Sequence, residues 1–546
     1  MNNKNLKFSF IILFLVTGFW LLVFSSSAQS FDDKKAKQLE ADILANINDK
    51  KTVAMLDDLA AIYMDAREYN QLADFLKRLK VSRISPCDFP VGYYIGLCRH
   101  NQLRFLEEKQ LWQEFFDKGD AYRKELFEET QQIVENCPAS IVSIRAQTIN
   151  WLECMALNGD VFREAVTKLI EITSKYAQTP DVDINIIKET ADALRGENLS
   201  PDAKVLYGLY VEKLITQEIS VDKLRSYAEE GLKDGNVELG EIIYKRYIRL
   251  IKDKMSKDQL SAELILIVKE FATDGWSKGK DPAYAQEVFA LLKEYCGESY
   301  FTEDIQYLRA YNLERLKEYP LSIEEYALLA KNFPQGKHID EAEFKLGIML
   351  SYINADREKG KAYFQEIIGR SSQLEYTVES LYHLSLLAQY GGNFEEARKD
   401  YGRILELIAG KNEFIELIGR VEQRQKEIKE SKPIEYNLKI FLGNVFSPQD
   451  NTDKVSLELD VSPYKVIGSQ EVKFSLKQVT LGTGCLSPDF NYIWSGDLGS
   501  VSQPPVEAEF SVSYKTPGVK VVNVVVSSAM GTIGQTIEMA EVYNQR

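Results

Sequence analysis

Cysteine and histidine are scarce in this sequence of 546 residues. Three histidines are present, and they lie too far apart to indicate a Ser-His-Asp set or a histidine-based zinc site: His100, His338 and His383. The six cysteines show no C-x-x-C spacing and are too sparse for a disulfide-rich scaffold; they are Cys87, Cys98, Cys137, Cys154, Cys296 and Cys485. We therefore expect no enzymatic activity, no metal site and no cofactor.

Long runs of basic residues are also absent. The chain has 66 basic and 82 acidic residues, which gives a formal charge of −16. An excess of acid disfavours nucleic acid and anionic lipid, because both carry negative charge themselves. Nucleic acid is therefore not expected among the partners.

The first 28 residues differ from the rest of the chain. Lys4 and Lys7 precede an uninterrupted hydrophobic run of 17 residues, and Ser26 and Ala28 place small residues at the minus three and minus one positions of a cleavage site. This pattern predicts a secretory signal peptide over residues 1–28. Its removal leaves 64 basic and 82 acidic residues, a formal charge of −18, and no expected membrane span. The alternative is an uncleaved anchor, since 17 residues are near the lower limit for a span.

The junction of Ala28 and Gln29 resembles that of exported proteins of the Bacteroidetes. The resemblance implies a periplasmic location, or an outer-membrane-associated or extracellular one. Export would permit disulfide bonds. Cys87 in SPCDFP and Cys137 in ENCPAS lie in Pro-marked loops where a bridge can form, and the alternative is that both are buried free thiols.

A small residue followed four positions later by an aromatic recurs along the chain. The pair Ala397 and Tyr401 has three counterparts upstream at spacings of 37, 38 and 37 residues: Gly360 with Phe364, Ser322 with Tyr326, and Ala285 with Phe289. Four copies in register indicate an internal repeat. Each small residue marks a close crossing of two helices, and each aromatic fills the space beside it. An apolar helical segment precedes each copy, so the predicted unit is a helix pair and the array is an α-solenoid.

The repeat pattern weakens toward the N-terminus. A gap of 45 residues, with TDGWSKGKD as the insertion, leads to Gly240 with Tyr244; further steps of 37 and 38 lead to Ala203 with Tyr207 and Ala165 with Leu169. The stretch LAAIYMDAREYNQLADFLKRL predicts another helix pair, but the pattern cannot be placed between Leu79 and Ala165. We therefore assign degenerate helical repeats to residues 29–257, and clear repeats with a polar closing helix to residues 258–432.

The repeats resemble the tetratricopeptide repeat family. That consensus has Leu with a small residue in the first helix, Ala with an aromatic in the second, and a Pro at the end of the unit, which are matched by Leu346 with Gly347, Leu384 with Ser385, Ala397 with Tyr401, and Pro334. The period of 37 to 38 departs from the family's period of about 34. The stretch NFPQGKHIDEAEFKLGIML is similar to bacterial envelope members of the family.

In the tetratricopeptide family, the first helices line a concave groove. The resemblance places an aromatic ladder with one rung per repeat in this groove: Tyr307 with Tyr311, Phe344 with Ile348, and Tyr382 with Leu386. Such a row would bind an extended peptide or a partner helix. The alternative is that these side chains pack against neighbouring helices.

After Pro433 the periodicity becomes two. The segments VSLELDV, EVKFSLKQV, AEFSVSYK and VKVVNVVVSS, separated by turn residues, predict a β-sandwich over residues 433–546. The region resembles the polycystic-kidney-disease (PKD) type of immunoglobulin-like domain, whose motifs are matched by Tyr492, Trp494, Gly496, Asp497, Tyr514, Thr516, Pro517, Gly518 and Val522, while Leu498 replaces a family glycine. The resemblance implies a spacer or adhesion module. Asp489 and Asp497 are candidates for calcium binding.

The combined prediction is an exported, non-catalytic scaffold in which an all-α solenoid precedes an all-β immunoglobulin-like sandwich. Its predicted function is protein–protein interaction in a periplasmic or outer-membrane-associated assembly. The alternative is a glycan- or peptidoglycan-binding protein that uses the aromatic ladder or Trp494 as stacking platforms.

Overall fold

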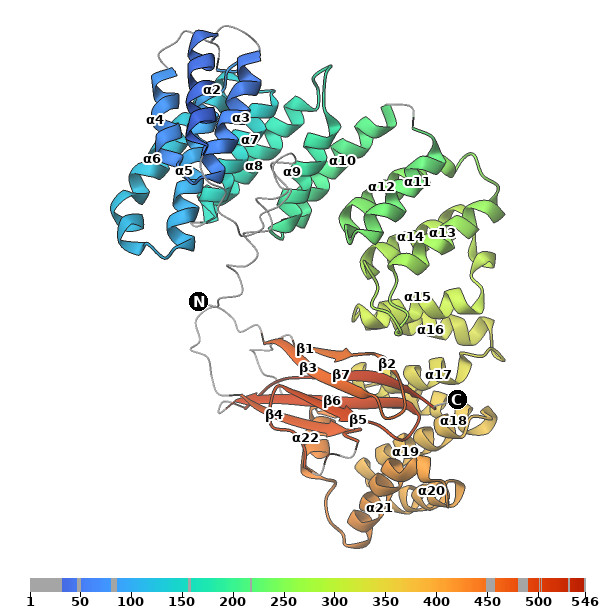
Figure 1. Cartoon of the computed structure of the whole chain (residues 1–546). Coiled ribbons are helices and arrows are strands. Elements are labelled where there is room, and N and C mark those ends of the chain that lie inside the picture. The colour runs from blue at the N-terminus through green and yellow to red at the C-terminus, as the bar shows by residue number, and fades with distance from the viewer. Residues whose placement is uncertain are drawn as a thin grey trace. The chain divides into compact units, whose positions relative to one another are not determined.

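The structure is a computed structural model of the chain (Figure 1). It describes residues 32–46, 51–79, 86–155, 159–216, 219–447, 457–479, 490–499, 501, 503–528 and 531–544. The predicted signal peptide, Cys485 and Asp489 lie outside these residues. The chain forms two compact units, one ending at Asp253 and one running from Lys254 to Arg546. Each unit is described by itself.

The first unit is an array of helices in which most successive helices pack against each other. Its helices are α2 (Asp33–Ala45), α3 (Lys51–Asp65), α4 (Tyr69–Leu79), α5 (Val91–Glu108), α6 (Trp112–Asn136), α7 (Ile141–Cys154), α8 (Gly159–Tyr176), α9 (Ile184–Gly196), α10 (Ser200–Thr216), α11 (Val221–Lys233) and α12 (Val237–Ile251). Polar caps begin several of them; Asn236, for example, accepts the Leu239 N–H at 3.1 Å before α12. The described residues of the predicted helical region thus form helices joined by turns and loops, with no strand among them.

The second unit continues the helical array before it turns to strands. Its helices are α13 (Lys257–Phe271), α14 (Pro282–Tyr295), α15 (Glu303–Arg315), α16 (Tyr319–Asn332), α17 (Ile339–Ile348), α18 (Arg357–Arg370), α19 (Leu374–Tyr390), α20 (Phe394–Leu407), α21 (Ile415–Lys429) and α22 (Tyr436–Phe446). Short helical turns lie between them: η1 (Glu298–Tyr300), the π-helical η2 (Met349–Ile353) and η3 (Asn412–Phe414). The predicted insertion TDGWSKGKD forms the connection between α13 and α14.

The repeated small and large residues lie where the sequence predicts them. Each small residue is buried on the second helix of a pair, from Ala165 on α8 to Ala397 on α20, and its larger partner is buried one turn later. Gly360 on α18 shows why size is limited, since a Cβ there would lie 2.0 Å from Ser351 Oγ and 2.9 Å from the Gly347 carbonyl oxygen. The predicted helical repeat is confirmed.

The pair α5 and α6 explains why the pattern could not be placed before Ala165. Here the small residue sits on the first helix, and a Cβ on Gly96 would lie 2.4 Å from Thr130 Cγ2 of the second helix. In addition, α6 is 25 residues long, which breaks the repeat period. The two helices still cross closely, but the glycine that permits the crossing lies on the first helix of the pair instead of the second.

The C-terminal strands form two sheets, as a sandwich requires. The strands are β1 (Leu457–Ser462), β2 (Lys465–Ile467), β3 (Glu471–Val479), β4 (Asn491–Gly496), β5 (Glu509–Ser513), β6 (Gly518–Ser528) and β7 (Gly531–Tyr543). One sheet has the order β1-β3-β5 and is antiparallel; the other has the order β2-β7-β6-β4, with β2 parallel to β7. Trp494, Phe474 and Tyr514 lie in the core between the sheets.

The four-stranded sheet is buried on both faces. Along β6, Val522, Val524 and Val526 face the sandwich core, whereas Val519, Val521 and Val525 belong to the core formed by the repeat helices. The latter core also contains Ile537 and Met539 of β7. Because both faces are covered, β6 reads as a continuous apolar run instead of an alternating strand. Figure 1 shows the sheet lying against the helices of the second unit.

Two features of the C-terminal region differ from the prediction. The region assigned wholly to strands begins with helix α22, whose apolar residues Leu438, Phe441, Leu442 and Val445 recur at helical spacing and pack in the helical core. The strand prediction also missed β7, in which Glu538 and Glu541 interrupt the apolar pattern. Both elements depend on partners elsewhere in the unit, so their local sequence does not reveal them.

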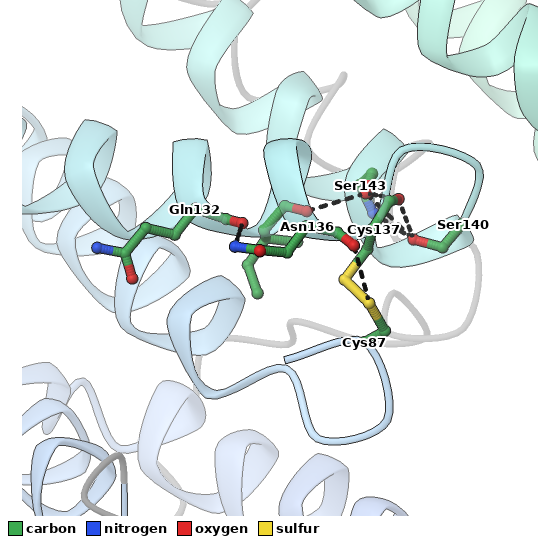
Figure 2. Close-up of a disulfide and its surroundings, with 7 residues drawn as sticks. Cys87, Gln132, Asn136, Cys137, Ser140 and Ser143 are labelled. Carbon is green, nitrogen blue, oxygen red and sulfur yellow. Dashed lines mark hydrogen bonds between the residues drawn. A yellow bond between two sulfur atoms is a disulfide. The ribbon is translucent and has the colours of Figure 1, made fainter. Parts of the chain in front are cut away.

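A disulfide bond joins Cys87 to Cys137, across 50 residues of sequence and a Cα separation of 5.5 Å. Figure 2 shows the bond at the C-terminal end of α6, where the Ser140 hydroxyl donates to the Cys137 carbonyl oxygen at 2.9 Å. The open question about these two cysteines is thereby answered in favour of the bridge. Cys98, Cys154 and Cys296 are buried free thiols, and burial raises the pKa of Cys98 to about 12.

Candidate functional site

The candidate site is the surface formed by α15, α17 and α19, here called the inner face. These helices carry the six side chains of the proposed aromatic ladder. All six are buried, with at most 6 % of their surface exposed: Tyr307, Tyr311, Phe344, Ile348, Tyr382 and Leu386. The inner face is therefore covered, in part by the chain's own β-sandwich and in part by neighbouring helices.

Tyr307 and Tyr311 contact the sandwich directly. Their rings stack with centroids 5.8 Å apart. Lys465 of β2 donates from Nζ to the Tyr307 hydroxyl at 3.0 Å and lies 4.6 Å from the centre of the Tyr311 ring. The Tyr311 hydroxyl donates to Glu541 Oε2 of β7 at 3.1 Å. The first rung of the ladder thus binds two charged residues of the sheet, at positions where an external peptide was expected.

A network of buried charges surrounds this rung. Lys345 of α17 is fully buried and lies 2.6 Å from Glu541, 3.0 Å from Glu314 and 3.3 Å from Glu341. Arg315 of α15 pairs with Glu314 and lies 3.0 Å from Glu538 of β7. Helix cations and strand carboxylates therefore neutralise one another across the interface.

The pKa values of this network favour its ionised form. Burial alone would raise the pKa of Glu314, but Arg315 and Lys345 beside it lower that pKa to about 2. Burial would lower the pKa of Lys345, but Glu314, Glu541 and Glu341 raise it above its ordinary value. Glu314 and Lys345 hence remain ionised near neutral pH, and each depends on the opposite charges beside it for compensation.

A second group of contacts joins the other end of the inner face to the sandwich. Arg420 of α21 forms ion pairs with Asp497, which follows β4, and with Glu379 of α19 at 2.8 Å. The Arg420 guanidinium also lies 4.6 Å from the centre of the Tyr382 ring. Tyr382, in the third rung of the ladder, therefore packs against Arg420, which in turn forms an ion pair with Asp497 of the sandwich.

Backbone groups of the sandwich are bound as well. Glu416 of α21 accepts the Lys515 N–H at 2.9 Å and the Thr516 N–H at 3.2 Å. Asn437 of α22 donates from Nδ2 to the Trp494 carbonyl oxygen at 2.9 Å. Glu416 and Asn437 were not among the predicted site residues, because nothing near them in the sequence indicates that they contact the sandwich.

The middle rung of the ladder belongs to the helical core. Phe344 packs against Phe364 of α18 and Tyr376 of α19, with ring centroids 5.8 and 6.0 Å away. His383 lies against the rings of Phe344 and Phe364, and burial lowers its pKa to about 3. Ile348 and Leu386 join this core. For these residues the structure shows packing between helices, which was the alternative to a ligand contact.

The insertion between α13 and α14 clasps the edge of the four-stranded sheet. The Gly275 carbonyl oxygen accepts the Lys465 N–H at 3.3 Å, and Trp276 lies over Tyr543 of β7 with ring centroids 5.1 Å apart. Asp274 Oδ1 accepts the N–H groups of Trp276 and Ser277 at 2.9 and 2.7 Å. The seven or eight residues by which this repeat exceeds its neighbours thus serve the sandwich.

Trp494 and Asp497 of the PKD-like motif are both committed to contacts within the chain. Trp494 is fully buried and its Nε1–H donates to the Glu507 carbonyl oxygen at 2.8 Å, so it has no surface for stacking on a glycan. Asp497 is buried too; it pairs with Arg420 and accepts the Val521 N–H at 2.8 Å. Its carboxylate is committed to structural partners, and its proposed companion Asp489 lies outside the described residues.

The three histidines lie in separate surroundings. His100 contacts Glu153 at 2.7 Å, His338 contacts Asp304 at 2.8 Å, and His383 contacts Tyr352 at 2.9 Å. Within the part of the chain that the structure describes, no three His, Cys, Asp or Glu side chains are grouped to hold a metal ion. Searching the same residues finds no helix that is both long and apolar enough to cross a membrane.

Comparison with known proteins yields neither a family nor a curated relative. No protein-family model matches the chain, and no curated protein matches it. Among solved structures, a human IFIT1 dimer with m7Gppp-AAAA is similar at 14% identity and a TM-score of 0.21, over 72% of this chain and 95% of that one. A circular tandem repeat protein is similar at 11% identity and a TM-score of 0.15, over 78% and 95%. At these TM-scores the likeness carries no argument about function.

Proposed function

We propose that this chain is an exported, non-catalytic scaffold that holds a protein partner in the cell envelope. A helical repeat array is typical of interaction scaffolds, because stacked repeats offer long surfaces without a catalytic cleft. The buried ion pairs described above join the helices to the sandwich. The resemblance of the repeats to envelope tetratricopeptide proteins supports the same proposal.

The observation that carries the proposal of export is the disulfide bond. Bridges such as Cys87–Cys137 form and persist in oxidising compartments, and they are rare in the reducing cytosol. The bond agrees with the secretory pattern of residues 1–28. Periplasmic and outer-membrane-associated locations are both consistent with it.

The covered inner face changes where a partner is expected to bind. In the second unit, the sandwich occupies the surface on which a tetratricopeptide protein would hold its ligand. We therefore place the partner on other surfaces of the repeats, and we assign the sandwich a bracing role in the second unit. Buried ion pairs join the sandwich to the repeat helices, and this arrangement argues against the spacer role that the PKD resemblance implies.

Two measurements in intact cells test the proposal. Fractionation should recover the mature chain outside the cytoplasm, with Cys87 and Cys137 resistant to alkylation until a reductant is added. Crosslinking followed by pull-down should return the same protein partners in replicate experiments. A cytoplasmic chain with two reactive thiols would refute export, and the absence of any reproducible partner would refute the scaffold.

Glycan binding remains the second candidate, and one observation favours it. Trp276 is 56% exposed, rests on Tyr543 and is held by the Asp274 turn, so it offers a rigid aromatic platform that the buried Trp494 does not. Saturable binding to purified cell-wall material that Trp276→Ala abolishes would support this candidate. Equal retention of the variant and the original protein would exclude Trp276 as the platform.

A further inference from the structure

The first turns of α6 expose a cluster of apolar side chains, here called the α6 knob: Leu111, Trp112, Phe115 and Phe116. Phe116 is 74% exposed, Trp112 is 47% exposed and Leu111 is 42% exposed. The Phe115 ring lies between the other two rings, 6.0 Å from Trp112 and 5.9 Å from Phe116. The three aromatics follow the spacing i, i+3, i+4 and so share one side of the helix.

The α6 knob is supported from the interior of the first unit. The Arg123 guanidinium lies 5.0 Å from the centre of the Phe115 ring, and its Nε is 3.8 Å from Glu153 Oε2. Glu153 is buried on α7, where it also contacts Arg104 at 2.9 Å. Burial alone would raise the pKa of Glu153, but His100 and Arg104 lower it to about 2, so the carboxylate near Arg123 stays charged. Phe115 therefore packs against a cation that has a buried acidic neighbour.

The other end of α6 is fixed by the disulfide bond. Cys137 directly follows the helix, and its bond to Cys87 ties the helix to the segment before α5 (Figure 2). A surface that is rigid before binding loses little conformational entropy when a partner docks. Exposed aromatics on such a support are typical of the anchor residues of protein interfaces.

The charges around the α6 knob indicate the chemistry of its partner. Residues 111–120 contain Glu114, Asp117 and Asp120 but a single base, Lys118, which pairs with Glu114 at 2.9 Å. The Asp120 side chain is fully exposed, and its Oδ1 lies 3.5 Å from Arg123 Nη1, so Asp117 is the acid of this segment that has no basic neighbour within ion-pair distance among the described residues. These acids, together with the acidic excess of the whole chain, attract a basic partner and repel anionic membranes and nucleic acid.

We propose that the α6 knob is a docking point for a protein segment that has apolar residues at its centre and Lys or Arg at its flanks. The inference rests on the proposed scaffold function and specifies the partner that the first unit accepts. Trp112 and Phe116 insert among the apolar residues of the segment, and Asp117 and Asp120 pair with its cations.

The direct test uses the mature, disulfide-bonded chain and two labelled peptides of about 15 residues, a length that spans several helical turns. Both peptides have the same Leu and Phe centre; one has Lys flanks and the other has Glu flanks. We expect fluorescence anisotropy to show that the Lys peptide binds about tenfold or more tightly than the Glu peptide, with a preference that shrinks as salt is added. Equal binding of the two peptides would overturn the proposal.

Variants locate the binding on α6. Phe116→Ser and Trp112→Ser should each weaken binding of the Lys peptide by about tenfold or more, because anchor residues carry most of the affinity. Asp117→Asn combined with Asp120→Asn should reduce the preference for Lys flanks. Phe394→Ser is the matched control, since Phe394 is 51% exposed at the start of α20 beside Glu395 and Glu396. No aromatic ring of the described residues pairs with it. This control variant should leave binding unchanged.

Three other outcomes would replace the proposal. Full affinity in Phe116→Ser with correct folding by circular dichroism would place the peptide elsewhere. A dimer in light scattering that Phe116→Ser dissolves would show that a second copy of the chain covers the knob. Binding to neutral lipid vesicles that exceeds binding to the Lys peptide would assign the knob to a membrane surface. None of these measurements depends on export, so a cytoplasmic chain would refute the proposed envelope role and leave the docking result intact.

Discussion

Lys345 on α17 and Glu541 on β7 lie 2.6 Å apart, with both side chains almost completely buried. They are separated by 196 residues of sequence. The contact joins a helical repeat to a β-sandwich, and it lies at the place where the tetratricopeptide resemblance predicts an external ligand. Tyr307 and Tyr311 beside it also bind residues of the sandwich, namely Lys465 and Glu541.

Removing Lys345 should destabilise the chain severely. Lys345→Met leaves Glu314, Glu341 and Glu541 without their shared cation, and breaking a buried ion pair on one side costs about 3–5 kcal/mol in the free energy of unfolding. Chemical denaturation of the full mature chain measures the change. The control is Lys361→Met, which removes an exposed pair with Glu358 on α18 and should cost less than about 1 kcal/mol. Similar losses in the two variants would show that the buried network contributes no special stability.

Gly360→Ala should destabilise the repeat in which it lies. The added methyl group would meet Ser351 Oγ and the Gly347 carbonyl oxygen, and such overpacking costs about 1–3 kcal/mol. Gly369→Ala on the same helix is the control, because no atom lies within 4 Å of its added Cβ. It should be neutral or stabilise by up to about 1 kcal/mol through helix propensity. Thermal unfolding of both variants decides whether the small residue is required by the helix crossing.

Removing the disulfide bond should weaken the first unit. Cys87→Ser with Cys137→Ser frees a loop of 50 residues, and the loss is expected to be about 2–4 kcal/mol. Unfolding in the presence of a reductant should lower the stability of the original protein and leave the double variant unchanged. Cys296→Ala provides a control for a buried thiol outside the bond and should keep the sensitivity to reductant.

Acid should destabilise the second unit through His383. The pKa of this buried histidine is lowered to about 3, below the ordinary value of 6.5 that it regains on unfolding. Its contribution to stability is therefore complete above pH 6.5 and is lost as the pH falls from 6.5 toward 3, by about 1.4 kcal/mol per pH unit. His383→Gln should remove this slope.

The informative quantity is the difference in unfolding free energy between the original protein and His383→Gln at pH 7, 6 and 5. The difference cancels the titration of carboxylates that both proteins share. We expect it to shrink by about 2 kcal/mol between pH 6.5 and pH 5, following the same slope. A difference that stays constant would show that His383 titrates normally in the folded chain.

The helical repeat was predictable because its signal is local and repeated. Ala397 with Tyr401 and its counterparts mark helix crossings, and each crossing needs a small residue wherever it occurs. Strands β3 and β6 were predictable for a similar reason, since their β-branched and apolar residues form compact runs. The α5–α6 pair escaped the pattern because Gly96 performs the same task from the other helix.

The candidate site was less accessible to sequence reasoning. Tyr307 and Tyr311 were recognised as inner-face residues, but their partners Lys465 and Glu541 lie in strands that the periodicity did not reveal. The local sequence around Glu541 is typical of a surface position in a weak strand. Glu541 is buried because Lys345 of α17 compensates its charge. The alternative of a glycan platform needs Trp494 at the surface, but the sandwich core buries this residue.

The sequence by itself determined the helix pairs, their close crossings and the change to strands near the C-terminus, because these follow from residue size and hydrophobic periodicity along short stretches of chain. Only the tertiary structure decided that the sandwich covers the inner face, that Cys87 joins Cys137, and that the α6 knob is exposed. Each of these depends on contacts between residues that are distant in the sequence. Charge compensation, disulfide pairing and burial all arise from such contacts, so no local sequence pattern encodes them.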